Sequence, residues 1–384
     1  MDRIRVGRSL QGSGYAIETA GFIERCRVFR LRALALLLGL IPGVAVAETA
    51  APATAKDPVL DAMTPCATGA DPEARAVACT NLITGGTLKG RALGAAYVFR
   101  GKAQAQRNEI KAAITDFSEA LKLDPAATDA LYNRGAAYAL MGQTKSALAD
   151  FAQVLELAPN DPDTLFYRAL IYVNQGKIES AVKDLGGVLK QRPEDGVSRL
   201  QRAGLLIALQ RNEDAIGDLD LLLKKDPAAF DARYSRGRAR MLKGDNAAAA
   251  EDFNSLMLGR KDNPYAALRL YIVRARAGEK DPAPLAAAAK AYPDDQWPMP
   301  VVAFYQGRMS EADLLAAAKV SDPATKANLT AETQYYLGQG ALLQDDRKGA
   351  EQHFKAAVAA KAGVGNLESI DAGLELKRLA KTKG

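Results

Sequence analysis

Small and large apolar residues alternate with polar ones in a pattern that repeats every 34 residues along the middle of the chain. Each unit contains a small residue at the same position, namely Gly101, Gly135, Ala169, Ala203 and Gly237. An alanine follows twelve positions later and a large apolar residue four positions after that, giving Ala113, Ala147, Ala181, Ala215 and Ala249, then Phe117, Phe151, Leu185, Leu219 and Phe253. Small residues facing large ones at these spacings predict pairs of closely packed helices.

Proline marks the end of the second helix in the first four units, at Pro125, Pro159, Pro193 and Pro227. It cannot continue a helix, so it fixes the turn into the next unit. Over residues 95–262 the pattern resembles the tetratricopeptide repeat (TPR) family, whose period is 34 residues. The resemblance implies an all-α fold, a right-handed superhelical solenoid of TPR helix-turn-helix repeats with capping helices.

The repeats predict how the rest of the chain is divided. Five repeats fill residues 95–262, a divergent repeat fills 263–296, a helical pair outside the pattern fills 297–329, and a further repeat fills 330–362. Residues 48–94 are expected to form a linker and an N-terminal cap, with a helix from Asp71 to Ile83. Residues 363–384 are expected to form an amphipathic capping helix and a basic tail, because solenoid ends need polar caps.

Residues 1–47 read as a secretory signal peptide: four arginines precede the apolar run from Ala33 to Ile41, and small residues end at Ala47. The run is shorter than the roughly 20 residues that span a bilayer, so a retained anchor is the alternative and no membrane span is expected after cleavage. Translation starting near Val28 also stays open. We expect an exported, periplasmic protein.

Removing residues 1–47 takes away seven arginines and three acids, so the net charge falls from +6 to +2. A nearly neutral chain lacks the basic excess that neutralises phosphates, and no nucleic-acid partner is expected. The two remaining cysteines, Cys66 and Cys79, are predicted to form a structural disulfide, as is typical of exported proteins. Two free buried thiols are the alternative.

An arginine precedes the first small residue of every repeat, and an aspartate follows each arginine sixteen positions later. The pairs are Arg100 with Asp116, Arg134 with Asp150, Arg168 with Asp184, Arg202 with Asp218, and Arg236 with Asp252. The arginines could bind phosphate or peptide carboxylates. Equal numbers of partners favour structural ion pairs that join the two helices of each repeat.

The TPR resemblance implies that the first helices line a groove, and their positions outside the packing pattern carry mainly aromatic and amide side chains. The candidate groove residues are Phe99, Lys102, Gln106, Tyr132, Asn133, Phe166, Tyr167, Asn174, Gln201, Tyr234 and Arg238. Such side chains suit an extended or helical segment of another protein. The alternative is that some of the rings only pack helix to helix. Partner identity is not encoded, and a homodimer stays open.

Chemistry typical of enzymes is not evident. The chain has one histidine, His353, and after signal cleavage only the cysteine pair, which cannot assemble a zinc site. No glycine-rich phosphate loop or nucleophile elbow is found, and Asp294 with Asp295 reads as a solvated turn. We therefore predict no catalytic residue, no metal and no cofactor.

The last third also resembles the family of the bacterial lipoprotein NlpI. The resemblance rests on Trp297-Pro298, Phe304-Tyr305, Gly307, Glu332-Thr333, Tyr336-Leu337-Gly338 and Phe354. It implies an adaptor of the cell envelope that brings proteases to peptidoglycan hydrolases. The lipidated cysteine of that family has no counterpart near Glu48. A stable subunit of an envelope complex is the alternative, and a cell-wall enzyme is disfavoured.

Overall fold

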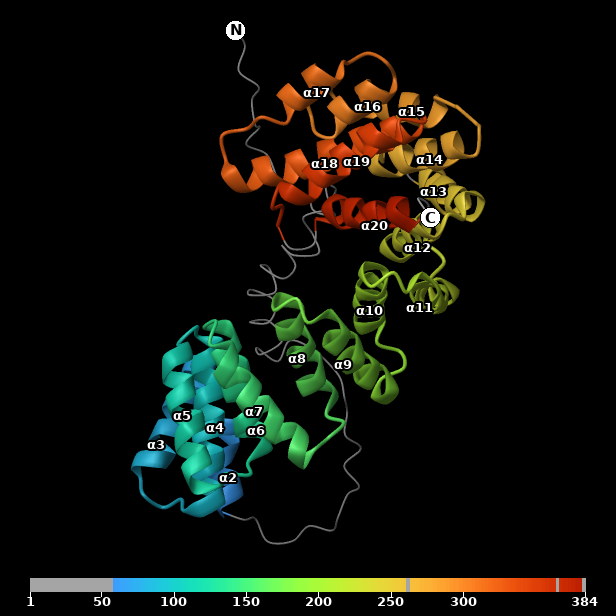
Figure 1. The fold of residues 1–384 in the computed structure, drawn as a ribbon. Helices are drawn as coiled ribbons and strands as arrows, with labels where there is room; N and C mark the ends of the chain where they lie inside the picture. Colours follow the sequence, from blue (N-terminus) through green and yellow to red (C-terminus); the bar gives the residue numbers. More distant parts are fainter. Residues whose placement is uncertain (1–57, 260–262, 364–365, 382–384) are drawn as a thin grey trace. The chain divides into compact units, whose positions relative to one another are not determined.

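The computed structural model describes residues 58–259, 263–363 and 366–381, and within them every regular element is an α-helix (Figure 1). The all-α fold of consecutive helix pairs is confirmed. The predicted signal peptide, residues 1–47, lies outside the described residues. The described chain forms two compact units that divide between Pro193 and Glu194. We call them the N-terminal unit and the C-terminal unit.

The N-terminal unit contains three helix pairs preceded by two further helices. Its helices are α2 (Pro58–Thr68), α3 (Pro72–Thr84), α4 (Gly90–Gln106), α5 (Ile110–Leu123), α6 (Thr128–Leu140), α7 (Thr144–Leu157), α8 (Pro162–Asn174) and α9 (Ile178–Gln191). The structure bonds Cys66 of α2 to Cys79 of α3, and both residues are fully buried. The sequence did not predict α2, because Pro65 lies inside it and an internal proline argues against a helix.

The C-terminal unit contains five helix pairs and a final helix. Its helices are α10 (Gly196–Ala208), α11 (Asn212–Lys225), α12 (Phe230–Lys243), α13 (Asn246–Gly259), α14 (Pro264–Arg276), α15 (Ala283–Ala291), α16 (Met299–Tyr305), α17 (Glu311–Ala317), α18 (Pro323–Leu342), α19 (Arg347–Ala359) and α20 (Leu367–Lys381). Helix α18 begins before residue 330, the start predicted for the last repeat. Asp322 caps it by accepting a hydrogen bond from the Thr325 amide at 2.7 Å, and Pro323 suits its first turn.

Each repeat is held by a close contact between the small residue of its first helix and the large residue of its second. A methyl group built on Gly135 would lie 2.7 Å from the Phe151 ring, and one on Gly101 would lie 2.7 Å from Phe117. The same contact recurs at Gly237 and Gly338. Where the first residue is alanine, as at Ala169 and Ala203, the facing residue is leucine. Glycine is therefore required wherever phenylalanine fills the space between the helices.

This pairing predicts how one substitution depends on another. Gly135→Ala should lower the free energy of unfolding of the N-terminal unit by about 1–3 kcal/mol, because the added methyl group meets the Phe151 ring. With Phe151→Leu already present, the cost should fall to near zero or reverse sign, since alanine favours a helix over glycine by about 1 kcal/mol. Thermal unfolding followed by circular dichroism measures both effects. Equal costs in the two backgrounds would contradict the steric account.

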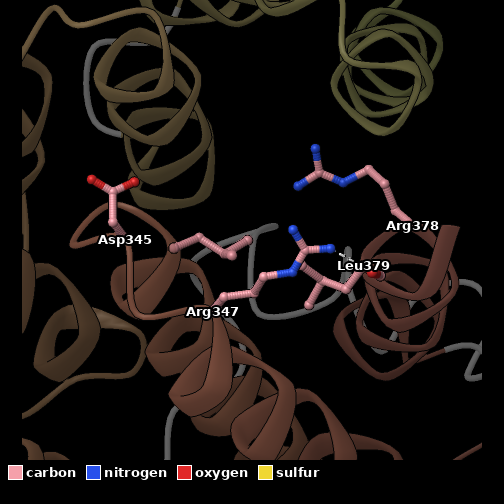
Figure 2. A pocket seen from close by; sticks show the side chains of 5 residues that line it. Asp345, Arg347, Arg378 and Leu379 are labelled. Atoms are coloured by element: carbon pink, nitrogen blue, oxygen red, sulfur yellow. Dashed lines mark hydrogen bonds between the residues drawn. The ribbon is translucent and has the colours of Figure 1, made fainter. Parts of the chain in front are cut away.

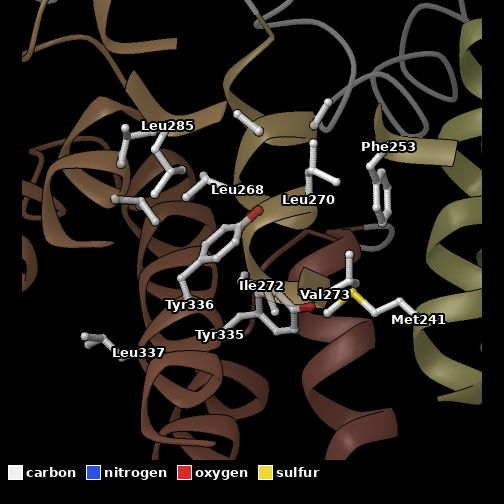
Figure 3. Close-up of a cluster of buried hydrophobic side chains, with 14 of the residues drawn as sticks. Met241, Phe253, Leu268, Leu270, Ile272, Val273, Leu285, Tyr335, Tyr336 and Leu337 are labelled. Atoms are coloured by element: carbon white, nitrogen blue, oxygen red, sulfur yellow. The ribbon is translucent and has the colours of Figure 1, made fainter. Parts of the chain in front are cut away.

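The apolar core of the C-terminal unit draws on residues far apart in the sequence. Figure 3 shows Tyr335 and Tyr336 of α18 pointing among Leu268, Leu270 and Ile272 of α14. All five side chains are at most 1% exposed. Helix α20 lies against α10, α12, α18 and α19 within the same unit (Figure 1). The last helix is therefore packed among the earlier repeats of this unit.

Candidate functional site: the first-helix faces

The structure brings together all five predicted arginine and aspartate pairs. In each pair Nε and Nη2 of the arginine donate to the two carboxylate oxygens, at distances from 2.5 to 3.0 Å. The aspartate side chains are 1% to 5% exposed and the arginines 16% to 26%. The hydrogen bonds that Arg168 donates to Asp184 raise the pKa of Arg168. These guanidinium groups are committed to joining the helices of each repeat.

We use the term first-helix face for the face of a unit formed by the first helices of its helix pairs. In the N-terminal unit these helices are α4, α6 and α8. Two of the predicted groove residues there, Tyr132 and Tyr167, pack on each other edge to face, with ring centroids 5.8 Å apart. Both also contact Phe151, at 6.2 and 6.4 Å, and burial raises the pKa of Tyr167. These rings hold α6 against α8.

Asn133 is also structural, which corrects its interpretation as a groove residue. It is 5% exposed, and its side-chain amide donates to the backbone oxygen of Asp129 at 2.6 Å and to the Asp129 carboxylate at 2.8 Å. Sequence spacing placed Asn133 on the groove side, but this bond within one helical turn turns the amide back onto its own helix.

Other predicted residues keep part of their surface on this face. Phe99, Gln106 and Phe166 are half-buried, and Asn174 is exposed at the end of α8. Lys102 bridges from α4 to α6 through an ion pair with Asp129 at 2.6 Å. The accessible part of the first-helix face of the N-terminal unit therefore combines aromatic, amide and charged groups.

Three predicted groove residues belong to the C-terminal unit. Gln201 is half-buried on α10. Tyr234 stacks on Phe230 with centroids 6.2 Å apart, and burial raises the pKa of Tyr234 to about 12. Arg238 is only 3% exposed and binds Asp371 of α20, with Nη2 to Oδ1 at 2.7 Å. The prediction of an accessible Arg238 was wrong, because α20 covers it.

Helix α20 carries three buried carboxylates on one side. Glu368, Asp371 and Glu375 are spaced i, i+3 and i+7, which places them on one face of a helix. Their exposed fractions are 0%, 0% and 1%. The sequence predicted an amphipathic capping helix here without assigning partners to its acids. The structure turns these three acids into the unit.

Arg269 of α14 lies at the centre of the contact between α20 and the rest of the C-terminal unit. It is fully buried, and its guanidinium lies 3.0 Å from Asp371, 3.2 Å from Glu368 and 4.8 Å from the centroid of the Tyr335 ring. Nη1 also donates to the Tyr335 hydroxyl. One cation thus binds two carboxylates and an aromatic face, which offsets much of the cost of burying it.

A second group of charges lies one helical turn further along α20. Glu375 accepts from Arg276 of α14 at 2.6 Å, from the Gln339 amide of α18 at 3.2 Å, and from Arg378 at 2.7 Å. Burial alone would raise the pKa of Glu375, but the two arginines outweigh it and hold the pKa below its usual value. Three arginines from α12 and α14 therefore match three carboxylates on α20.

Glu332 of α18 is a buried acid beside this network. It is 4% exposed, and burial, followed by the nearby Glu368 carboxylate, raises its pKa to about 8. Trp297, Tyr265 and Arg269 oppose the shift without cancelling it. Glu332 is therefore protonated at neutral pH, and burial raises the pKa of Glu368 as well.

Two pockets flank the C-terminal half of α20. The larger, of about 460 Å³, is lined by Leu342, Asp345, Arg347, Arg378 and Leu379 (Figure 2). At its edge Arg347 donates to the Leu379 carbonyl oxygen at 2.6 Å. The smaller, of about 190 Å³, lies on the side of α12 and is lined by Gln210, Asn212, Leu242, Leu374, Glu375, Arg378 and Lys381. Both pockets are partly open to solvent beside this end of α20.

No group of three or more His, Cys, Asp or Glu side chains that could hold a metal occurs among the residues that the structure describes. His353 contacts the Gln334 amide oxygen through Nδ1 at 2.8 Å. Asp294 pairs with Arg308 at 2.8 Å at the surface. Across the described ranges, no helix combines the length and apolar character needed to cross a bilayer.

Comparison with known families identifies the repeats. Residues 101–142 match a TPR repeat model, and residues 128–161, 163–195 and 200–267 each match a tetratricopeptide repeat model. The chain thus carries tetratricopeptide repeats, as the spacing predicted.

Solved structures with similar folds include YrrB, described as a TPR protein with an unusual peptide-binding site, at 21% identity and a TM-score of 0.45 over 50% of this chain and 96% of that one. Another is a tetratricopeptide repeat protein from Parabacteroides merdae, at 18% identity and a TM-score of 0.44 over 75% of this chain and 98% of that one. A third is yeast Tom70, at 14% identity and a TM-score of 0.39 over 97% of this chain and 76% of that one.

The raised pKa of Glu332 predicts a dependence of stability on pH. The folded unit keeps this proton up to about pH 8, whereas the unfolded chain loses it near 4.5. The free energy of unfolding should therefore be highest below the lower value and fall as pH rises to the higher one. Between about pH 5.5 and 7.5 the fall should be steeper in the wild type than in Glu332→Gln, by up to about 1.4 kcal/mol per pH unit.

Fluorescence of Trp297, the chain's single tryptophan, reports unfolding of this unit in urea at each pH. Glu279→Gln is the matched control, because Glu279 is exposed in the same unit. The control should keep the wild-type dependence on pH. If Glu332→Gln keeps it too, Glu332 is ionised in the folded unit and the account of its burial is wrong.

Proposed function

We propose that the chain is a scaffold that binds segments of other proteins, and that the first-helix face of the N-terminal unit is a binding surface. The observation that carries this proposal is the chemistry left accessible there. Phe166 is half-buried, Asn174 is exposed, and the fully packed arginine and aspartate pairs hold the helices beneath them in register. Partly exposed aromatic rings beside amide groups are the side chains that anchor peptide segments.

We further propose that this scaffold works in the bacterial periplasm as an adaptor between envelope enzymes, a protease and a peptidoglycan hydrolase. The signal-like pattern of residues 1–47 supports export. The pair of Cys66 and Cys79, bonded in the structure and the only cysteines beyond residue 47, supports an oxidising compartment. The NlpI-like residues from Trp297 onward support the adaptor role.

The test is capture of partners from an envelope fraction by tagged protein, quantified by mass spectrometry. Phe166→Ala combined with Asn174→Ala should reduce capture at least tenfold, since a buried aromatic anchor contributes about 2 kcal/mol or more. This pair replaces the Tyr132 and Tyr167 positions suggested by sequence, because those rings support the fold.

Leu157→Ala is the matched control. Leu157 is 54% exposed on α7, a second helix, so its loss removes apolar surface away from the proposed site. The control should capture the same partners as the wild type, and circular dichroism should show all three proteins folded. If the double variant captures partners as well as the wild type does, the first-helix face of the N-terminal unit is not the binding surface. Partners other than envelope proteases or hydrolases would refute the adaptor role.

A further inference from the structure

The first-helix face of the C-terminal unit already holds a helix, the chain's own α20. This helix contacts α10 and α12, and its carboxylates reach Arg238, Arg269 and Arg276. Arg238 occupies the same repeat position as Lys102 in the N-terminal unit, but the Arg238 side chain is 4% exposed and that of Lys102 is 31% exposed. Equivalent surfaces of the two units are thus in different states.

The chemistry of this face specifies what can occupy it. With α20 removed, Arg238, Arg269 and Arg276 would lose their carboxylate partners, one of which, Asp371, binds both Arg238 and Arg269. An occupant that covers these guanidinium groups has to supply carboxylates, because a cation buried without a counter-charge is strongly unfavourable. The spacing of Glu368, Asp371 and Glu375 on α20 defines the pattern that fits, namely acids at i, i+3 and i+7 of one helix.

The contact between α20 and this face leaves some buried polar atoms without hydrogen bonds. Glu368 Oε2 and Arg269 Nε, both buried in the contact, make no hydrogen bond within the described part of the chain. Pockets of about 460 and 190 Å³ lie on either side of its C-terminal half. Ala372, Leu374 and Leu379 supply its buried apolar side chains, and Leu376 packs partly buried against the same core. A helix with the same acids and larger apolar groups could bind this face better.

We propose that the first-helix face of the C-terminal unit is a receptor for partner helices that carry carboxylates at i, i+3 and i+7, and that such a helix binds in place of α20. This inference deepens the proposed scaffold function and rests on it. It uses a surface separate from Phe166 and Asn174. Substitutions at Phe166 and Asn174 that abolish partner capture should leave peptide binding to the C-terminal unit unchanged. A failure of the proposed scaffold function can therefore be told apart from a failure of this inference.

The probe is a fluorescent synthetic peptide with the sequence of residues 366–381, titrated with full-length protein and followed by anisotropy. The wild type should bind it weakly, because its own α20 competes. Asp371→Asn in the full chain removes a carboxylate that binds Arg238 and Arg269, so it should bind the peptide at least tenfold more tightly. A peptide with Glu368→Gln, Asp371→Asn and Glu375→Gln should bind at least tenfold more weakly.

Two control variants separate release of α20 from general loosening. Gly338→Ala strains the contact of α18 with Phe354 but touches no α20 charge, so it should not raise peptide affinity. Adding Arg238→Gln to the Asp371→Asn chain should lower the affinity for the peptide. The proposal is overturned if Asp371→Asn brings no gain, if Gly338→Ala brings an equal gain, or if the neutral peptide binds as well. It is also overturned if light scattering finds a dimer that the peptide dissociates, since the occupant would then be a second copy.

Discussion

A carboxylate buried between two helices stays charged only if a guanidinium lies against it, and this constraint recurs throughout the molecule. Every repeat from Asp116 to Asp252 buries one aspartate under a bidentate arginine. The pair adjoins the tightest steric contact, since Arg134 precedes Gly135 and Asp150 precedes Phe151. A shift of one helix along the other would break both the ion pair and the contact, so together they fix the register of each repeat.

The same chemistry acts over long sequence distances in the C-terminal unit. Arg238 and Asp371 are 133 residues apart, yet they form a pair as buried as those within single repeats. Arg269 and Arg276 extend the pairing along α20. The final helix therefore joins the unit through its charged side, which distinguishes it from a solenoid cap that turns its charges to solvent.

Sequence reasoning succeeded where partners stand at fixed separations. The small and large positions and the arginine and aspartate pairs recur within each repeat, so periodicity alone predicted their contacts. It failed where partners come from distant segments. Nothing local marks Asp371 as the partner of Arg238, although the acids at i, i+3 and i+7 of α20 were a visible signal. Asn133 was misassigned because spacing gives the side of a helix, while a local hydrogen bond decides its exposure.

The central claim is that paired buried charges seat α20, and a double-mutant cycle between Arg238 and Asp371 tests it most directly. Free energies of unfolding for Arg238→Met, Asp371→Leu and both together would be measured in urea through Trp297 fluorescence. Asp371→Leu leaves Arg238 buried without a carboxylate and should cost about 3–5 kcal/mol, whereas Arg238→Met leaves Asp371 with Arg269 alone and should cost less. The double change should cost much less than the sum of the two. Additivity within about 0.5 kcal/mol would contradict the account.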